Sequence, residues 1–143
     1  MPNHFHLLVH ANDASVVIVR DGSFERQQFS QGMKMLLSSY TKGVNREQGC
    51  SGSLFQQKTK AKCVTEKEYA LTAFHYIHQN PLKAGLVGKM EDWPYSSFID
   101  YIGRRNGTIC KKNIANLYLN VCSDFLYKEA YEIVDEALLK EIE

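Results

Sequence analysis

The chain has 143 residues, enough for one domain with a buried core, and 44% hydrophobic against 23% charged residues is an ordinary globular composition. No apolar run approaches the roughly 18 residues of a membrane-spanning helix, and residues 1–4 (MPNH) do not open a secretory signal. We therefore expect a cytoplasmic protein without membrane contact, whose four scattered cysteines are reduced.

Charge is divided unevenly along the chain. The net charge is +1, but residues 1–123 carry 15 Lys and Arg against 9 Asp and Glu, whereas residues 124–143 carry 2 against 7. A basic body followed by an acidic tail favours a phosphate-bearing partner. The ordinary alternative, a solvated charged surface, stays open because basic patches are common.

Residues 4–10 (HFHLLVH) alternate imperfectly between polar and apolar side chains and predict a strand. In a strand, His4 and His6 share one face, so both imidazoles could bind a single cation. Residues 11–22 surround a β-branched run with Asn, Asp and Gly, and predict a loop with a short extended segment.

Apolar residues at helical spacing then predict an amphipathic helix from about Ser30 to Glu47, with Ser30 as N-cap and Gly49 as the stop. Residues 54–64 follow a glycine-rich turn and predict one or two strands. Within them Lys58, Lys60 and Lys62 alternate, which would place three ammonium groups on one face of a strand.

A second helix is predicted to begin at a capping box, in which Thr65 caps the helix and Glu68 reaches back to the cap amide. Pro81 is predicted to end it, because the residue before a proline is pushed out of the α region. Tyr76 and Asn80 are an i, i+4 pair, so a phenol lies one turn from a side-chain carbonyl. Together with the two imidazoles they could form a metal-assisted tyrosine nucleophile.

Each of these residues also has an ordinary interpretation. A His-x-His pair is more often structural than metal-binding, a tyrosine on a helix usually belongs to the core, and an asparagine before a proline can mark only a helix end. We interpret His10, His75 and His78 as structural. Further along, residues 96–102 predict a short helix ended by Gly103, and the last twenty residues predict a charged amphipathic helix.

Four segments, in this order, resemble the IS200-like or REP-associated tyrosine transposases, the single-tyrosine branch of the HUH nucleases. They are MPNHFHLLV at 1–9, GSLFQ at 52–56, YIHQNPLKAGLV at 76–87 and WPYSS at 93–97. Four motifs in the family order are far more specific than any one of them. The resemblance covers roughly residues 1–103.

The resemblance implies a function for each matched residue. His4, His6 and Asn80 would bind a divalent cation, Mg²⁺ or Mn²⁺, and Tyr76 would be the nucleophile. Members of the family cleave and rejoin single-stranded DNA through a 5′-phosphotyrosine intermediate and a free 3′ hydroxyl. The expected partner is single-stranded DNA with hairpins, which would contact Lys58, Lys60, Lys62 and Lys83, and a homodimer stays open.

The resemblance also implies a fold. It is an α+β two-layer sandwich, with an antiparallel ferredoxin-like sheet and helices on one face. Residues 1–110 would form the catalytic domain and residues 111–143 a C-terminal helical extension. In the family a strand, a helix and another strand precede the His-x-His strand. We therefore expect this fold to be truncated at its N-terminus, with a sheet that is incomplete beside residues 4–10.

Two other functions stay open. The chain could be a truncated, inactive remnant that binds structured single-stranded DNA without cleaving it. It could also be an unrelated hydrolase that uses the His-x-His pair for zinc. The second is the weaker, because Leu8 stands where a metallo-β-lactamase-like motif requires an aspartate.

Overall fold

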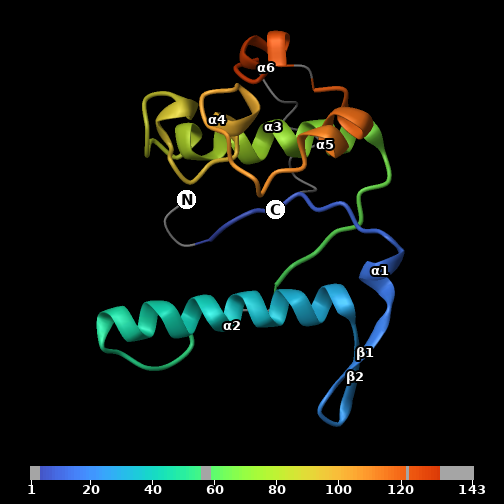
Figure 1. Cartoon of the computed structure of the whole chain (residues 1–143). Coiled ribbons are helices and arrows are strands. Elements are labelled where there is room, and N and C mark those ends of the chain that lie inside the picture. Colours follow the sequence, from blue (N-terminus) through green and yellow to red (C-terminus); the bar gives the residue numbers. More distant parts are fainter. Residues whose placement is uncertain (1–3, 56–58, 122, 133–143) are drawn as a thin grey trace. The chain divides into compact units, whose positions relative to one another are not determined.

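The computed structural model describes residues 4–55, 59–121 and 123–132, and these form a mixture of helices and one two-stranded antiparallel sheet. The chain divides into two compact units, Val9–Ala61 and a second unit made of Met1–Leu8 and Lys62–Glu143 (Figure 1). The α+β class is thus confirmed. The described residues hold only the pair of strands β1 (Ile18–Asp21) and β2 (Phe24–Gln27), so the larger ferredoxin-like sheet is not seen among them.

The unit Val9–Ala61 is a hairpin followed by one long helix. A single-turn helix, α1 (Asp13–Val16), is closed by a capping box between Asn12 and Ser15, and β1 and β2 then pair with Asp21 opposite Phe24. The two residues between the strands begin with Gly22 at φ 66°, which a tight hairpin turn requires at that position. The extended segment expected within residues 11–22 is therefore one arm of a hairpin.

Helix α2 (Gln28–Gln48) confirms the amphipathic helix predicted from Ser30 to Glu47. Gly49 adopts a left-handed conformation at φ 63° and ends the helix, as predicted. The prediction of Ser30 as N-cap is wrong. Strand β2 leads directly into the helix, whose N-cap is Gln27 without a side-chain cap hydrogen bond, and the Gln28 N–H donates to the carbonyl of Val17 at 2.8 Å.

The other unit is organised around helix α3 (Lys67–Lys83), whose second half is almost completely buried. Around it lie a 3₁₀ turn η1 (Met90–Asp92) and three short helices, α4 (Phe98–Tyr101), α5 (Lys112–Leu119) and α6 (Ser123–Glu129) (Figure 1). One apolar cluster joins Phe74 to residues beyond 110, and a second lies beside the end of α3. Their buried members are Phe74, Leu119, Val121 and Leu126 in the first, and Met90, Phe98 and Ala130 in the second.

Two details of α3 differ from the sequence prediction. The N-cap is Glu66 rather than Thr65, whose hydroxyl reaches only the Glu66 carboxylate at 3.4 Å. The helix also continues through Pro81 to Lys83. A proline inside a helix loses one hydrogen bond, but Pro81 is buried and its carbonyl accepts from Leu86 N–H at 3.0 Å. Tertiary packing therefore outweighs the local preference, and Asn80 lies within the helix.

The strand predicted over residues 4–10 is wrong, because this segment has no regular secondary structure. The described part of residues 54–64 likewise contains no strand, and residues 56–58 lie outside the described residues. A strand needs a neighbour to pair its backbone N–H and C=O groups, and among the described residues the strands paired in a sheet are β1 and β2.

The short helix and its stop at Gly103 are close to their predicted positions, since α4 is followed by Gly103 at φ 75°. The C-terminal helix begins at Ser123 as predicted, and α6 ends at Glu129 within the part that the structure describes. The rest of the predicted tail helix, residues 133–143, lies outside the described residues. No described helix is both long and apolar enough to cross a membrane.

Candidate functional site

The tyrosine and the asparagine of the candidate site lie on the buried half of α3. Tyr76 and Asn80 are each 6% exposed and are separated by one helical turn. The N-terminal residues 4–8 belong to the same compact unit as α3. There the imidazole of His6 contacts the Tyr76 ring edge to face, with centroids 5.7 Å apart and planes at 72°.

His4 extends this contact by one ring. Its imidazole lies edge to face with that of His6, at a centroid distance of 5.0 Å and an interplanar angle of 83°. His4 is exposed and His6 is half-buried. The structure thus brings His4, His6 and Tyr76 together, although residues 4–8 are not a strand, because an extended chain of any kind places i and i+2 side chains close to one another.

The donor set fits a divalent cation. Two imidazoles are common ligands of divalent transition metals, and the ring centroids of His4 and His6 lie 5.0 Å apart. The Nδ2 atom of Asn80 is buried and has no hydrogen-bond partner among the described residues. If the side-chain amide of Asn80 is rotated by 180°, its carbonyl oxygen takes the position of Nδ2 and could act as a metal ligand.

Within the described residues no acidic ligand joins this site. Among the residues that the structure describes, no group of three or more His, Cys, Asp or Glu side chains could hold a metal ion. A cation bound by His4 and His6 would therefore complete its shell with the Asn80 amide, water or a phosphate oxygen. Two imidazoles suit manganese better than magnesium, and the oxygen ligands suit both.

The histidines that flank Tyr76 have structural environments. His78 is 2% exposed, and its Nε2 lies 2.7 Å from the hydroxyl of Ser97. Burial, and to a lesser degree the neighbouring His75, lower the pKa of His78 to about 3. Burial also lowers the pKa of His75, against the opposing effect of Glu129 and Glu132. Both imidazoles are neutral at pH 7, in agreement with the structural interpretation.

Gln79 is a residue whose role sequence reasoning missed. Its Nε2 donates to the carbonyl of Ala130 at 2.8 Å and to that of Glu132 at 2.9 Å. Through these hydrogen bonds Gln79, a residue of the motif around Tyr76, also holds the chain beyond α6 against α3. No local signal could have revealed this, because the partners are 51 and 53 residues away and are backbone atoms.

An ion pair missed by the sequence analysis holds the WPYSS motif. Arg105 donates to both carboxylate oxygens of Asp100, at 2.9 and 2.6 Å, and to the carbonyls of Pro94 and Ser96, at 2.7 and 2.8 Å. Gly107 N–H adds a bond to Asp100 at 2.8 Å. Despite burial, the hydrogen bonds from Arg105 above all hold the pKa of Asp100 below its usual range. Segments 76–80 and 93–97 are thus parts of one structure, joined by His78 and Ser97.

Comparison with known proteins points to the same family as the motifs. A curated protein of Haemophilus influenzae described as a REP-associated tyrosine transposase is 28% identical over 100 residues, which cover 68% of this chain and 54% of the relative. The similarity supports the REP-associated tyrosine transposase family. The chain spans about half of the length of that relative. No protein-family profile matches the chain, and no solved structure matches it.

Of the lysines expected to bind DNA, the described Lys60 and Lys62 do not lie on a strand. Lys58 lies outside the described residues, and Lys60 and Lys62 lie in a segment without regular structure. The Lys62 ammonium sits 4.6 Å from the centre of the Tyr69 ring. Lys83 is exposed at the last residue of α3. The prediction of three ammonium groups aligned on one strand is therefore wrong, while a role of these lysines in binding DNA stays a prediction.

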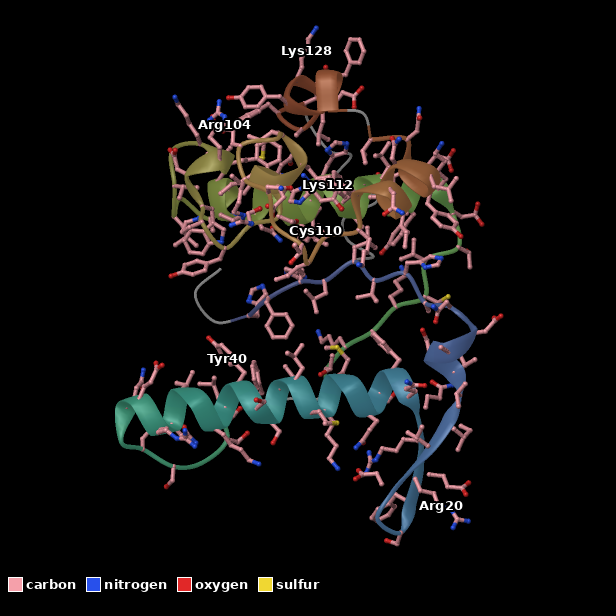
Figure 2. All side chains as sticks on the ribbon, viewed as in Figure 1. Arg20, Tyr40, Arg104, Cys110, Lys112 and Lys128 are labelled. Atoms are coloured by element: carbon pink, nitrogen blue, oxygen red, sulfur yellow. The ribbon has the colours of Figure 1, made fainter. Side chains whose placement is uncertain are left out.

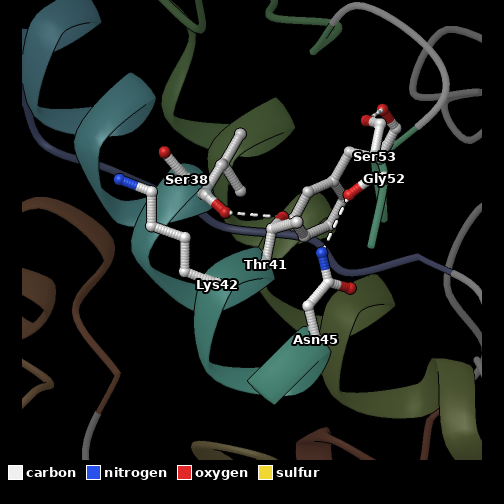
Figure 3. A pocket seen from close by; sticks show the side chains of 8 residues that line it. Ser38, Thr41, Lys42, Asn45, Gly52 and Ser53 are labelled. Carbon is white, nitrogen blue, oxygen red and sulfur yellow. Dashed lines mark hydrogen bonds between the residues drawn. The ribbon is translucent and has the colours of Figure 1, made fainter. Parts of the chain in front are cut away.

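A shallow pocket of about 400 Å³ lies in the unit Val9–Ala61, and none of its described lining residues is a predicted site residue (Figure 3). It is formed where the chain after α2 folds back along the helix, held by a hydrogen bond from Asn45 Nδ2 to the Gly52 carbonyl at 3.0 Å. Its lining comprises Leu37, Ser38, Thr41, Lys42, Asn45, Gly52, Ser53 and Phe55. Lys42 is the one titratable group among the described residues of this lining.

Proposed function

We propose that the chain carries the catalytic site of a metal-dependent, single-strand DNA transposase, with Tyr76 as nucleophile and His4, His6 and Asn80 as metal ligands. The observation that carries the proposal is the contact of the His4, His6 and Tyr76 rings, with Asn80 one turn away on the same helix. The four family motifs and the similarity to the Haemophilus influenzae protein support it.

In the proposed reaction the Tyr76 phenol loses its proton and its oxygen attacks the phosphorus of a phosphodiester. An O–P bond forms to Tyr76, the bond from phosphorus to the 3′ oxygen breaks, and that oxygen leaves as a hydroxyl after it takes up a proton. Reversal of the same step rejoins the strands. A bound cation supplies stabilisation of the negative charge that develops on the phosphate.

This chain's own residues would position the reacting groups. The helix α3 sets Tyr76 and Asn80 one turn apart, while His6 holds the phenol ring by an edge-to-face contact. Tyr76 is only 6% exposed. We propose that residues 4–8, of which His6 contacts the Tyr76 ring, shift when DNA approaches its hydroxyl. The same burial favours the alternative function, an inactive remnant that binds structured single-stranded DNA without cleaving it.

A covalent-adduct assay tests the proposal. Labelled single-stranded hairpin oligonucleotides from the DNA that flanks the gene are incubated with the protein and Mn²⁺ or Mg²⁺, then separated on a denaturing gel. We expect a labelled protein band that a chelator abolishes and that Tyr76→Phe abolishes. Tyr69→Phe, the same change two turns earlier on α3, is the matched control and should retain the band.

The histidine ligands are tested in the same assay. His4→Ala and His6→Ala should each reduce the band, with partial recovery at higher Mn²⁺ concentration, because each variant keeps one imidazole. A band that persists in Tyr76→Phe would refute the assignment of the nucleophile. Absence of any band, together with retained binding of the hairpins, would instead establish the non-cleaving remnant.

The finer fold belongs to the same proposal. We propose that the family's ferredoxin-like two-layer sandwich is the setting of this site, with residues 1–110 as its catalytic part and 111–143 as a helical extension. The family motifs support this arrangement. An experimental structure of the chain with a hairpin oligonucleotide would test it, and a complex in which residues 4–10 do not form a strand of the sheet would contradict it.

A further inference from the structure

The WPYSS segment presents an aromatic side chain to solvent. The ring of Tyr95 is 84% exposed, although the chain on either side of it is anchored. Trp93 is half-buried, and its ring meets that of Tyr95 edge to face, with centroids 5.4 Å apart and planes at 73°. The two rings therefore form a supported pair, in which Trp93 orients Tyr95 and one face of Tyr95 stays open.

The backbone under this pair is held from both sides. Arg105 donates to the carbonyls of Pro94 and Ser96, the residues that flank Tyr95, while Asp100 holds the guanidinium in place. Ser96 N–H donates to the carbonyl of Trp93 at 3.1 Å, which closes a tight turn with Tyr95 inside it. Tyr95 therefore projects outward because the backbone is fixed, and little ordering entropy remains to be lost on binding.

The surroundings favour an anionic partner. Residues 89–112 carry five Lys and Arg against three Asp and Glu. Two ion pairs, Asp100 with Arg105 and Glu91 with Arg104 at 3.3 Å, cancel two charges of each sign and leave Lys89, Lys111 and Lys112 against Asp92. Arg104, labelled in Figure 2, keeps 58% of its side chain exposed despite this pair. Aromatic rings interleaved with basic residues are the elements with which proteins bind single-stranded nucleic acid.

We infer that Trp93 and Tyr95 form a stacking platform for an unpaired nucleobase of single-stranded DNA. The open face of Tyr95 would take the base, and the basic residues around the loop would attract the phosphates. The inference rests on the proposed function for the choice of DNA as ligand. It adds a binding site that lies in the same unit as Tyr76 and is linked to α3 through the hydrogen bond between Ser97 and His78.

The chain contains its own probe for this site. Trp93 is the single tryptophan of the sequence, so its fluorescence reports on the platform alone. The full chain with Tyr76→Phe, which cannot form the proposed adduct, is titrated with oligothymidine. We expect quenching of Trp93 fluorescence on binding. Tyr95→Ala should weaken the affinity about 5- to 150-fold, because stacking on one aromatic residue contributes that much per base.

Three controls separate stacking from other causes. Tyr95→Phe should bind like the parent, because it keeps the ring. Tyr118→Ala, the same truncation at a side chain that is 53% exposed, should change the affinity less than twofold. An abasic oligonucleotide of equal length should bind the parent and Tyr95→Ala equally, since it offers phosphates without bases. Circular dichroism of each variant verifies that it is folded.

The result that overturns the platform is a Tyr95→Ala variant that binds oligothymidine as tightly as the parent. This outcome is distinct from failure of the proposed function. If no covalent adduct forms but binding depends on Tyr95, the platform stands and cleavage fails. If the adduct forms and Tyr95→Ala changes neither adduct nor affinity, the platform alone fails. Loss of affinity for the abasic oligonucleotide in Tyr95→Ala would also refute stacking.

Discussion

Replacement of Phe74 by alanine should be strongly destabilising, because this ring joins α3 to the chain beyond residue 110. Phe74 is 5% exposed and shares a cluster with Leu119, Val121 and Leu126. Its ring also meets three others edge to face, those of His78 at 4.4 Å, Tyr101 at 4.9 Å and His75 at 5.6 Å. The side chain is therefore both an apolar contact and the centre of an aromatic group.

The expected cost follows from these contacts. Truncation of a buried phenylalanine costs about 3–5 kcal/mol, through lost transfer free energy and the cavity that remains. These edge-to-face contacts place Phe74 toward the upper end of that range, because such pairs contribute about 0.5–1.5 kcal/mol beyond burial. We expect a loss of about 4 kcal/mol, a large part of a typical free energy of unfolding of about 5–15 kcal/mol. Phe74→Leu, which keeps most of the volume, should cost about 1.5 kcal/mol.

Urea unfolding, followed by the fluorescence of Trp93, measures this loss in the unit that contains Phe74. The matched control is Phe125→Ala, the same truncation at a ring that is 66% exposed on α6, with an expected change within about 0.5 kcal/mol. Equal losses in Phe74→Ala and Phe125→Ala would refute the reasoning. They would mean that the cluster between α3 and the residues beyond 110 does not stabilise the folded protein.

Two further predictions concern acid stability and helix ends. The hydrogen bonds from Arg105 lower the pKa of Asp100 in the folded state, so the parent should be more stable than Asp100→Asn. This difference in stability should be complete above the ordinary aspartate pKa of about 3.9 and should decline as the pH falls through the lower folded pKa. Urea midpoints at several pH values measure the difference, and a difference independent of pH would contradict the prediction. Gly43→Ala, inside α2, should stabilise the unit Val9–Ala61 by about 0.5–1 kcal/mol, whereas Gly49→Ala, at φ 63°, should destabilise it by about 1 kcal/mol. Neither glycine has a neighbour within 4 Å of an added Cβ, so backbone conformation alone decides whether the substitution stabilises or destabilises the helix. Hydrogen exchange of the α2 amides measures the change, and exchange rates that move in the same direction for both variants would show the reasoning to be wrong.

The structure changes how the family motifs are understood. In the segment 76–80, Tyr76 and Asn80 are candidates for chemistry, while His78 and Gln79 hold other parts of the chain. The WPYSS segment is fixed by Arg105, which lies outside every motif that the sequence analysis used. A motif is therefore a mixture of reacting and supporting residues, and only their contacts separate the two groups.

The sequence by itself determined the features that depend on neighbouring residues. Apolar spacing predicted α2 and α3, Gly49 and Gly103 marked the ends of helices through their positive φ, and the family motifs named Tyr76, Asn80, His4 and His6 as candidates. These signals are local, because helix periodicity and the conformational freedom of glycine act within a few residues.

Tertiary structure alone decided the features that depend on distant residues. Because of tertiary packing, α3 continues through Pro81. Gln79 donates a hydrogen bond to the Ala130 carbonyl. The His6 ring contacts the Tyr76 ring although residues 4–10 are not a strand. A strand exists only when another segment pairs with it. A buried proline in a helix is tolerated only when packing compensates for the lost hydrogen bond. A side chain that binds a distant carbonyl leaves no pattern in the sequence. Whether a contact of this kind forms is decided by the free energy of the whole folded unit.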